Sequence, residues 1–398
     1  MTVKQRCLLS SYIYQHTCSF AALSIPPLLP LISSELSLTA ANAGLLMFMV
    51  YLSTALTAPA SGYFTDRVAM KFLVVFSVGL LSLGLVLLSA ARDFLTLLAI
   101  ALMMGVGYSV SGPLSTKMVA SVFEQEMRAT ALGIKQTGTS SGSALASLIL
   151  PSIAVVAHRH SAFIAAAGIA AAAIPIIILT YVNTINPEKA QSERYMLGAM
   201  SRGDTILFQL GSFGLGFCMF AMIAHLPLFL TADVGFSIVE AGFMLALTQF
   251  FSVLGRVGLG VLADRFFSRK RTAVLSLASI IAAVSSTVFI LSVRSQTFIA
   301  AVSLAFIGFF LFGSIGVVFT IGSELFNSER VGTTSGMTYF FLALGNSFGP
   351  LVFGQLIDAL GYSTAWQLYV LAVCLCAFAF IFPLISHVKP GRLFSSQL

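Results

Sequence analysis

Long apolar stretches follow one another along almost the whole chain. A bilayer-spanning helix needs about 20 apolar residues, and twelve stretches between residues 8 and 387 are long enough. Only 9% of the residues are charged, whereas a soluble domain has about 25%. Too few polar side chains are left to cover a water-exposed surface. Because backbone polar groups within a bilayer must be bonded internally, and because the alternation of a barrel is absent, the sequence predicts an all-α integral membrane protein.

The predicted spans are separated by short polar junctions, such as "ARD" (91–93) and "AHRH" (157–160). One junction, residues 183–204, is much longer and splits the spans six and six. We therefore expect an N-terminal six-helix bundle over residues 1–184, a cytoplasmic linker over 185–203 and a C-terminal six-helix bundle over 204–398. The predicted spans are residues 8–33, 40–64, 71–91, 94–122, 129–157, 161–184, 204–231, 237–262, 272–293, 297–324, 332–357 and 364–387.

Lysine and arginine are unevenly distributed between the two sides of these spans. Of the 21, fifteen fall on the side that holds both termini and the linker, three on the opposite side, and three inside spans. Because positively charged loops stay in the cytoplasm, we expect a multi-pass protein of the plasma membrane (the inner membrane in a bacterium) with both termini cytoplasmic. We also expect the protein to be a monomer. The same split explains the net charge of +7 without a nucleic-acid partner.

The two halves repeat a loop motif. Span 2 is followed by "GYFTDRVAMK" and span 8 by "GVLADRFFSRKR", 198 residues later, and related loops with an arginine follow spans 4 and 10. Parallel six-helix repeats are typical of transporters. The residues that these loops contribute are Gly62, Asp66, Arg67, Lys71, Arg128, Gly260, Asp264, Arg265 and Arg330.

The repeated loops resemble the G-x-x-x-D-R-x-x-x-[KR] motif of the major facilitator superfamily, and the resemblance covers essentially the whole chain. It implies a fold of two pseudo-symmetric six-helix bundles and transport by alternating access. In that family these loops latch the two halves together at the cytoplasmic face in the outward-open state. We expect the motif glycines to permit tight helix packing and Asp66 to bridge to neighbouring helices.

Two positions differ from the proton-coupled drug antiporters of this superfamily. Many of those antiporters carry an arginine in helix 4 where this chain has Ala101, and a Gly-Pro motif in helix 5 that "GTSSGSALASLILP" lacks. Both departures argue against drug/proton antiport. Proton-coupled efflux of hydrophobic drugs or metabolites, which the phenylalanine-rich spans would suit, is kept as the alternative function, and a transport-inactive sensor or scaffold as a third.

Three cations, Lys117, Lys135 and Arg256, lie within the predicted spans. A charged side chain at the centre of a transmembrane helix costs at least about 2.5 kcal/mol. All three lie within about 12 Å of the cytoplasmic end of their helices, so side chains that snorkel to the headgroups are one interpretation. For Lys117, Glu124 and Glu126 would be nearby partners.

Lys135 and Arg256 also belong to polar helix faces. Lys135 shares a face with Thr139, and Arg256 shares one with Gln249 and Ser252. The two carboxylates that look embedded lie near helix ends and offer these cations no obvious counter-charge. We expect the cations to face a central aqueous cavity and to stabilise an anionic substrate, with arginine donating two hydrogen bonds to a carboxylate.

The segment "GRVGLGVLADR", with Arg256 four residues before Gly260, is similar to helix 8 of monocarboxylate and oxalate/formate carriers. The resemblance implies that this arginine binds the substrate carboxylate. Oxalate-type carriers place a second cation in helix 11, where this chain has none, so Lys135 would supply it from the opposite half. We therefore expect a secondary active transporter of a small organic anion, with no cofactor, metal site or enzymatic activity. The other expected substrate-binding residues are Gln249, Tyr339, Asn346, Gln136, Tyr12 and His16.

Helix 1 places Tyr12, Gln15 and His16 within about one turn. His16 is a candidate proton site, for which a hydrogen-bonded packing histidine is the alternative, and Tyr12 would also suit an interfacial anchor. A polar stripe on helix 4 runs from Tyr108 to Ser115. Packing between helices explains this stripe at least as well as substrate contact does.

Overall fold

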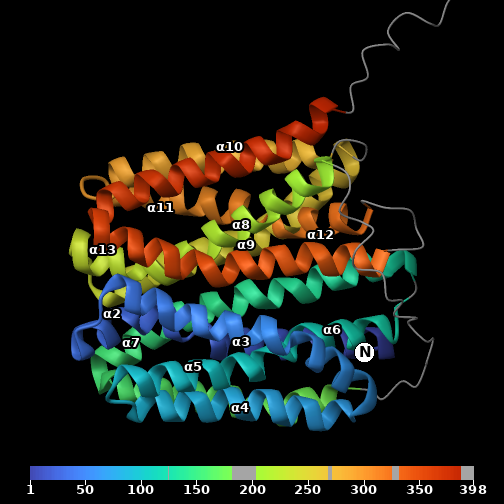
Figure 1. Ribbon diagram of the computed structural model, residues 1–398. Helices are drawn as coiled ribbons and strands as arrows, with labels where there is room; N and C mark the ends of the chain where they lie inside the picture. Colours follow the sequence, from blue (N-terminus) through green and yellow to red (C-terminus); the bar gives the residue numbers. More distant parts are fainter. Residues whose placement is uncertain (124, 182–202, 268–270, 325–330, 387–398) are drawn as a thin grey trace, which may run out of the picture.

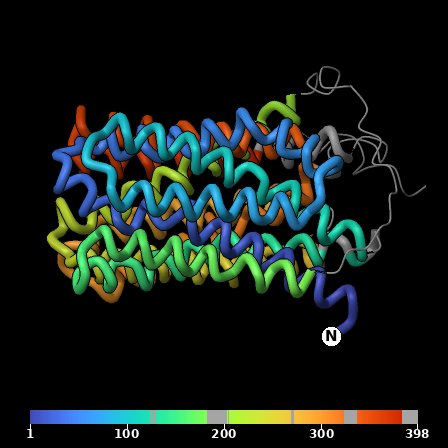
Figure 2. The backbone as a smooth tube through the Cα atoms, turned by 90° about the horizontal axis from the view of Figure 1, so that it is seen from below, coloured from blue at the N-terminus to red at the C-terminus, as the bar shows by residue number. Residues whose placement is uncertain are grey.

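The computed structural model of the protein describes residues 1–123, 125–181, 203–267, 271–324 and 331–386. Its helices run side by side along one axis (Figures 1 and 2), and the described residues contain no strand. The helices are α1 Val3–Ala22, α2 Ile25–Leu36, α3 Ala40–Arg67, α4 Met70–Ala90, α5 Phe94–Ser109, α6 Ser111–Ala120, α7 Gln125–Thr180, α8 Gly203–Phe229, η1 Leu230–Val234, α9 Ile238–Phe266, α10 Arg271–Ser292, α11 Thr297–Ile307, η2 Gly308–Phe312, α12 Ile315–Glu324 and α13 Val331–Ser386.

Ten helical stretches among the described residues are long and apolar enough to cross a membrane, and two of them are broken in the middle. The break in α7 lies at Ala157 and His158, and the break in α13 lies at Gly361, whose φ of 79° is readily adopted by glycine. Spans 5 and 6 of the sequence analysis are the two arms of α7, and spans 11 and 12 are the two arms of α13. The predicted all-helical membrane fold is confirmed.

Three predicted spans contain irregularities that the sequence pattern did not reveal. The first divides into α1 and α2 just before Pro26 and Pro27, which have no N–H to continue the helix. The fourth divides into α5 and α6 at Val110. The tenth contains the π-helix η2, whose Phe309 carbonyl lies 2.0 Å from a Cβ built on Gly255 of α9, so that the two backbones touch.

The elements α1–α7 occupy one half of the molecule and α8–α13 the other (Figure 1). We call the end at which α1 begins the N-terminal face and the other end the distal face. An ion pair ties distal segments within each half: Glu35 with Arg159 at 2.7 Å, and Asp233 with Arg294. The two acids are 198 residues apart, the same offset as the loop motifs. Residues 182–202, which include most of the predicted linker, lie outside the described residues, so the predicted domain boundaries stay a prediction.

The two halves make close contact at the distal face. A Cβ built on Gly44 of α3 would lie 2.1 Å from the carbonyl oxygen of Pro350 in α13. One built on Gly354 would lie 2.4 Å from the carbonyl oxygen of Ala40. The carboxylate of Asp358 caps the start of α3 from the other half. In this conformation, even a methyl group is excluded at Gly44 and at Gly354.

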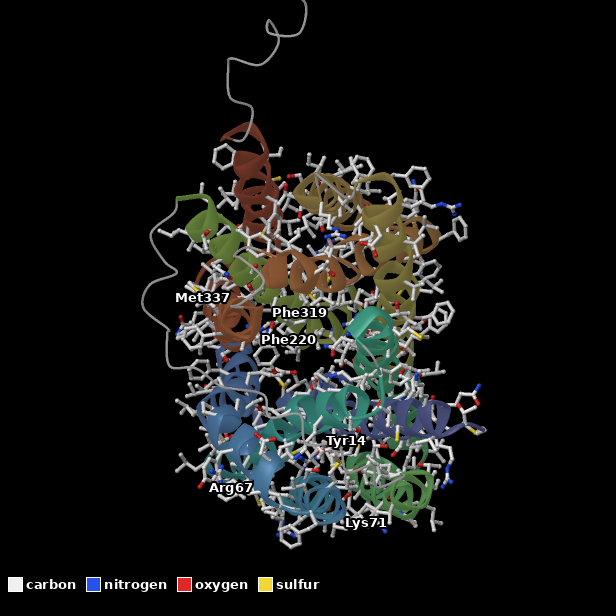
Figure 3. All side chains as sticks on the ribbon, turned by 90° about the vertical axis from the view of Figure 1, so that its right-hand side faces the viewer. Tyr14, Arg67, Lys71, Phe220, Phe319 and Met337 are labelled. Atoms are coloured by element: carbon white, nitrogen blue, oxygen red, sulfur yellow. The ribbon has the colours of Figure 1, made fainter. Side chains whose placement is uncertain are left out.

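Figure 3 looks onto the N-terminal face, with Arg67 and Lys71 in one half and Phe319 in the other, and Phe220 is seen deeper in the second half. Lys117 forms a salt bridge of 3.4 Å with Asp66 and donates to the backbone carbonyl of Thr65. The side chains of Glu124 and Glu126 lie outside what the structure describes, so these two expected partners stay a prediction, and Asp66 is a partner that the sequence analysis did not name. Because the end of α3 packs beside α6, the motif aspartate is within reach of this lysine.

Two other motif cations contact groups of their own half. Arg271 pairs with Asp264 at 3.0 Å within the C-terminal half, and the Arg67 guanidinium lies 3.6 Å from the ring centroid of Tyr63. Lys71 and Arg265 are exposed. The side chains of Arg128 and Arg330 lie outside what the structure describes.

The motif glycines are not tightly packed. A Cβ built on Gly62 or on Gly260 meets no atom within 4 Å. The expectation that these glycines permit close helix packing is therefore wrong for this conformation. The physical reason is that close backbone approaches between the halves, such as Gly44 with Pro350 and Gly354 with Ala40, lie at the distal face, whereas the motif glycines lie at the other end of their helices.

Candidate functional site

Lys135 lies in the first arm of α7, about 15 Å along the helix axis from its start. Its side chain is buried, with 5% exposed. The Nζ donates to Ser115 Oγ at 3.0 Å and to Thr116 Oγ1 at 3.3 Å, both on α6. Among the described residues it has no acidic partner within salt-bridge distance, so two hydroxyl groups are the hydrogen-bond acceptors of this ammonium group.

Arg256 approaches Lys135 from the other half. It is buried on α9, with 9% exposed, and its guanidinium donates to the backbone carbonyl of Gln136 at 2.6 Å. One turn away, Ser140 and Ser252 share a hydrogen bond of 3.0 Å across the same seam. Gln136 thus contributes its carbonyl here. The Arg256 Nε has no hydrogen-bond partner among the described residues, and no described carboxylate forms a salt bridge with this arginine.

Arg256 bonds the backbone carbonyl of Gln136, the residue next to Lys135, so two like charges lie at the same part of the seam and repel each other. In a buried environment this repulsion is weakly screened. A negatively charged group placed between them would relieve the repulsion and pair with both. The seam between α7 and α9 is therefore a candidate anion site.

A polar network extends from Lys135 to α1. The Ser115 hydroxyl donates to Gln15 Oε1 at 2.9 Å, and Gln15 Nε2 donates to Thr139 Oγ1 at 3.2 Å and to Ser19 Oγ at 3.4 Å. Ser19 Oγ lies 3.3 Å from the Tyr108 hydroxyl. Gln15 therefore connects the lysine to Tyr108, a role that the sequence analysis missed.

Glycines on α7 make this network possible. A Cβ built on Gly138 would lie 3.0 Å from the Tyr12 carbonyl oxygen, and one built on Gly142 would lie 2.3 Å from the His16 carbonyl oxygen. The backbones of α1 and α7 are therefore in contact, which brings Gln15 within reach of Thr139. Small residues at helix crossings have this effect throughout membrane proteins.

Tyr12 and His16 are placed apart from the lysine network. Both bond the hydroxyl of Ser141, at 2.9 Å for the Tyr12 hydroxyl and 2.8 Å for His16 Nδ1. His16 also lines a mostly apolar groove of about 350 Å³ between α1 and the second arm of α7, and neither Lys135 nor Arg256 lines that groove. The structure brings these two residues to each other rather than to the two cations.

The remaining predicted residues lie in the C-terminal half. Gln249 is buried on α9, two turns before Arg256. Tyr339 is 44% exposed and stacks on Phe319 with ring centroids 6.1 Å apart. Its hydroxyl lies 3.8 Å from a Cβ built on Gly112 of α6, so Tyr339 reaches towards the N-terminal half.

Asn346 faces α8 rather than the two cations. Its Oδ1 lies 2.7 Å from a Cβ built on Gly216 and has no hydrogen-bond partner among the described residues. One turn further along α8, Phe220 packs edge-on against Tyr51 of α3, with ring centroids 4.5 Å apart. Asn346 therefore belongs to the seam between α3, α8 and α13.

Comparison with known proteins gives a consistent relationship. The family profile described as "Major Facilitator Superfamily" matches residues 13–350. The chain is 24% identical to the hexuronate transporter of Bacillus subtilis (strain 168), over 93% of this chain and 90% of that protein. It is 26% identical to multidrug resistance protein 1 of the same organism, over 83% of this chain and 85% of that protein.

The fold is also shared with a solved structure. A bacterial homolog of the human lysosomal transporter Spinster, in an inward-facing and occupied conformation, superposes with a TM-score of 0.73 at 16% sequence identity, over 97% of this chain and 96% of that chain. The shared fold, the repeated loop motifs of this chain and the family match lead to one conclusion. The chain belongs to the Major Facilitator Superfamily of membrane transporters.

Proposed function

We propose that the protein is a secondary active transporter of a small organic anion with a carboxylate group. The observation that supports this substrate class is the pair of buried cations, Lys135 and Arg256, one from each half and neither in a salt bridge with a described residue. A carboxylate can accept two hydrogen bonds from a guanidinium and one from an ammonium. The substrate itself would then supply the missing negative charge.

The site also suits alternating access. Arg256 and Lys135 lie in different halves, so rocking of one half against the other would separate or reunite the two ligands of one carboxylate. By the positive-inside rule, the N-terminal face is cytoplasmic. The distal face, where the halves touch, is then the external face, and the conformation described here is closed to the outside.

A relative with a suitable activity supports the proposal: a hexuronate is a sugar carboxylate, and the hexuronate transporter aligns with nearly the whole chain. Efflux of hydrophobic drugs is the second candidate, because multidrug resistance protein 1 aligns as well. The phenylalanine-rich spans fit this candidate, but a buried pair of uncompensated cations has no role in binding a neutral or cationic drug.

Uptake into proteoliposomes tests the proposal. The purified chain is reconstituted and offered radiolabelled glucuronate, lactate and oxalate, and in parallel a fluorescent efflux dye. We expect transport of at least one acid, abolished by Arg256→Ala and retained by Arg294→Ala, which removes an exposed arginine at the distal face. Dye transport that survives Arg256→Ala, without transport of any acid, would establish the second candidate instead.

A further inference from the structure

Tyr51 is a buried tyrosine at the seam between the two halves. It lies on α3, about 16 Å along the helix axis from Ala40, with 5% of its surface exposed. Its ring packs edge-on against Phe220 of α8, at 77° between the ring planes, so the side chain points from one half towards the other. Its hydroxyl has no hydrogen-bond partner among the described residues.

A buried hydroxyl without a partner is unusual, because leaving it unsatisfied costs stability. Tyr14, which is also buried in this half, shows the usual arrangement, since its hydroxyl shares a hydrogen bond of 2.7 Å with Ser77. Phenylalanine would fill the position of Tyr51 without this cost. We therefore expect the Tyr51 hydroxyl to have a hydrogen-bond partner that is bound only part of the time, such as a ligand.

Tyr51 is also connected to the candidate anion site. Tyr108, which ends the polar network from Lys135, lies on α5 one turn from Gly105, whose backbone carbonyl accepts a hydrogen bond of 3.1 Å from Thr54 of α3, one turn from Tyr51. On the other side of the seam, the unpartnered Oδ1 of Asn346 lies against Gly216, one turn from Phe220. Two buried atoms without described partners, the Tyr51 hydroxyl oxygen and Asn346 Oδ1, thus lie close to Phe220 in the seam between the halves.

From this arrangement we propose that Tyr51 is a specificity-determining substrate contact that hydrogen-bonds a hydroxyl group at the uncharged end of the anion. The substrate class is then a hydroxylated carboxylate, such as a sugar acid, rather than an unsubstituted carboxylate. Lys135 and Arg256 bind the carboxylate end of the anion. Tyr51, with Asn346 as a second polar contact, hydrogen-bonds the hydroxyl end. This inference rests on the proposed function and narrows its substrate.

Binding to the full-length protein in nanodiscs, measured calorimetrically, tests the inference. The probes are the sugar acids glucuronate, galacturonate and gluconate, together with tetrahydropyran-2-carboxylate, which keeps a ring and the carboxylate but has no hydroxyl. We expect at least one sugar acid to bind more tightly than tetrahydropyran-2-carboxylate. Tyr51→Phe should weaken sugar-acid binding about tenfold, as for the loss of one hydrogen bond, and leave tetrahydropyran-2-carboxylate binding unchanged.

A matched variant and a stability measurement separate recognition from folding. Tyr14→Phe removes a hydroxyl that is already bonded to Ser77, so it should lower the melting temperature without changing the preference between the acids. Tyr51→Phe should not lower the melting temperature of the ligand-free protein, because its hydroxyl bonds no described residue.

Three outcomes would overturn the inference, and they differ in whether the carboxylate site is kept. Equal binding of all four acids, or no effect of Tyr51→Phe on sugar-acid binding, would refute the role of Tyr51 and keep the carboxylate site. Failure of every acid to bind would refute the proposed function together with this inference.

Discussion

The Asp358 carboxylate of α13 accepts hydrogen bonds from the first two backbone N–H groups of α3, those of Ala40 at 3.0 Å and Ala41 at 2.9 Å. These N–H groups have no acceptor within their own helix, and the helix dipole adds a favourable interaction with the negative charge. The donor helix and the acceptor belong to different halves. The cap therefore stabilises the conformation that is closed at the distal face.

Replacement of Asp358 by alanine should favour opening of the distal face. Loss of a helix cap costs about 0.5–2 kcal/mol, which corresponds to roughly a 2- to 30-fold change in the ratio of closed to open molecules. Spin labels at the exposed positions Ser34 and Gln296, with the exposed Cys374 replaced, would report the change as a longer distance in pulsed electron paramagnetic resonance. Asp93→Ala is the matched control, because Asp93 caps α5 within one half through the Thr96 N–H at 2.8 Å and should leave this distance unchanged.

A methyl group at Gly44 should destabilise the closed distal face for a steric reason. Its Cβ would lie 2.1 Å from the Pro350 carbonyl oxygen, so Gly44→Ala forces the two backbones apart. Gly62→Ala is the matched control, since its Cβ meets no atom within 4 Å and alanine is favoured over glycine in a helix by about 1 kcal/mol. Thermal unfolding should show Gly44→Ala destabilised and Gly62→Ala unchanged or stabilised. Equal melting temperatures for the two variants would contradict the close packing at this seam.

Lys135→Gln should weaken binding of the transported anion. A hydrogen bond to a charged group contributes about 1.5–3 kcal/mol, so the dissociation constant should rise roughly 10- to 100-fold in a calorimetric titration. Arg294→Gln removes a positive charge of the same size from the distal face, where its partner is Asp233, and should change the constant little. An equal loss in both variants would indicate that overall charge, rather than a site, attracts the anion.

The salt bridge between Lys117 and Asp66 should contribute little to stability. The aspartate side chain is 75% exposed and the lysine 35%, and exposed pairs are worth about 0–1 kcal/mol. A double-mutant cycle with Lys117→Gln and Asp66→Asn, followed by chemical unfolding, should give a coupling energy in this range. A coupling energy well above it would mean that the pair is far less hydrated than its exposure indicates.

Several features could be predicted from the sequence because they depend on local pattern. The apolar runs determined residence in the membrane, and the loops around Asp66 and Asp264 revealed the repeat and the family. Lys135 and Arg256 could be singled out because a cation inside a span is costly wherever its partner lies. The mutual proximity of these two residues across the seam is a property of the structure, since they are carried by α7 and α9 of different halves.

Other features depended on partners far away in the chain. Gln15 bonds Ser115 and Thr139, which are 100 and 124 residues away, and Asp358 caps a helix that begins 318 residues earlier. No periodicity in one helix reveals which residue of another helix it will meet. The glycines of the loop motif were misjudged for the same reason: the motif is visible in the sequence, but the face at which the halves touch is not.

By itself, the sequence determined that this chain forms membrane-spanning helices in a repeated arrangement, because hydrophobicity and charge along the chain decide which segments enter the bilayer. Only the tertiary structure decided which polar groups inside the bilayer find partners and which do not. That outcome depends on helix crossings at glycines such as Gly142 and Gly44, where backbones come into contact and residues from distant segments meet.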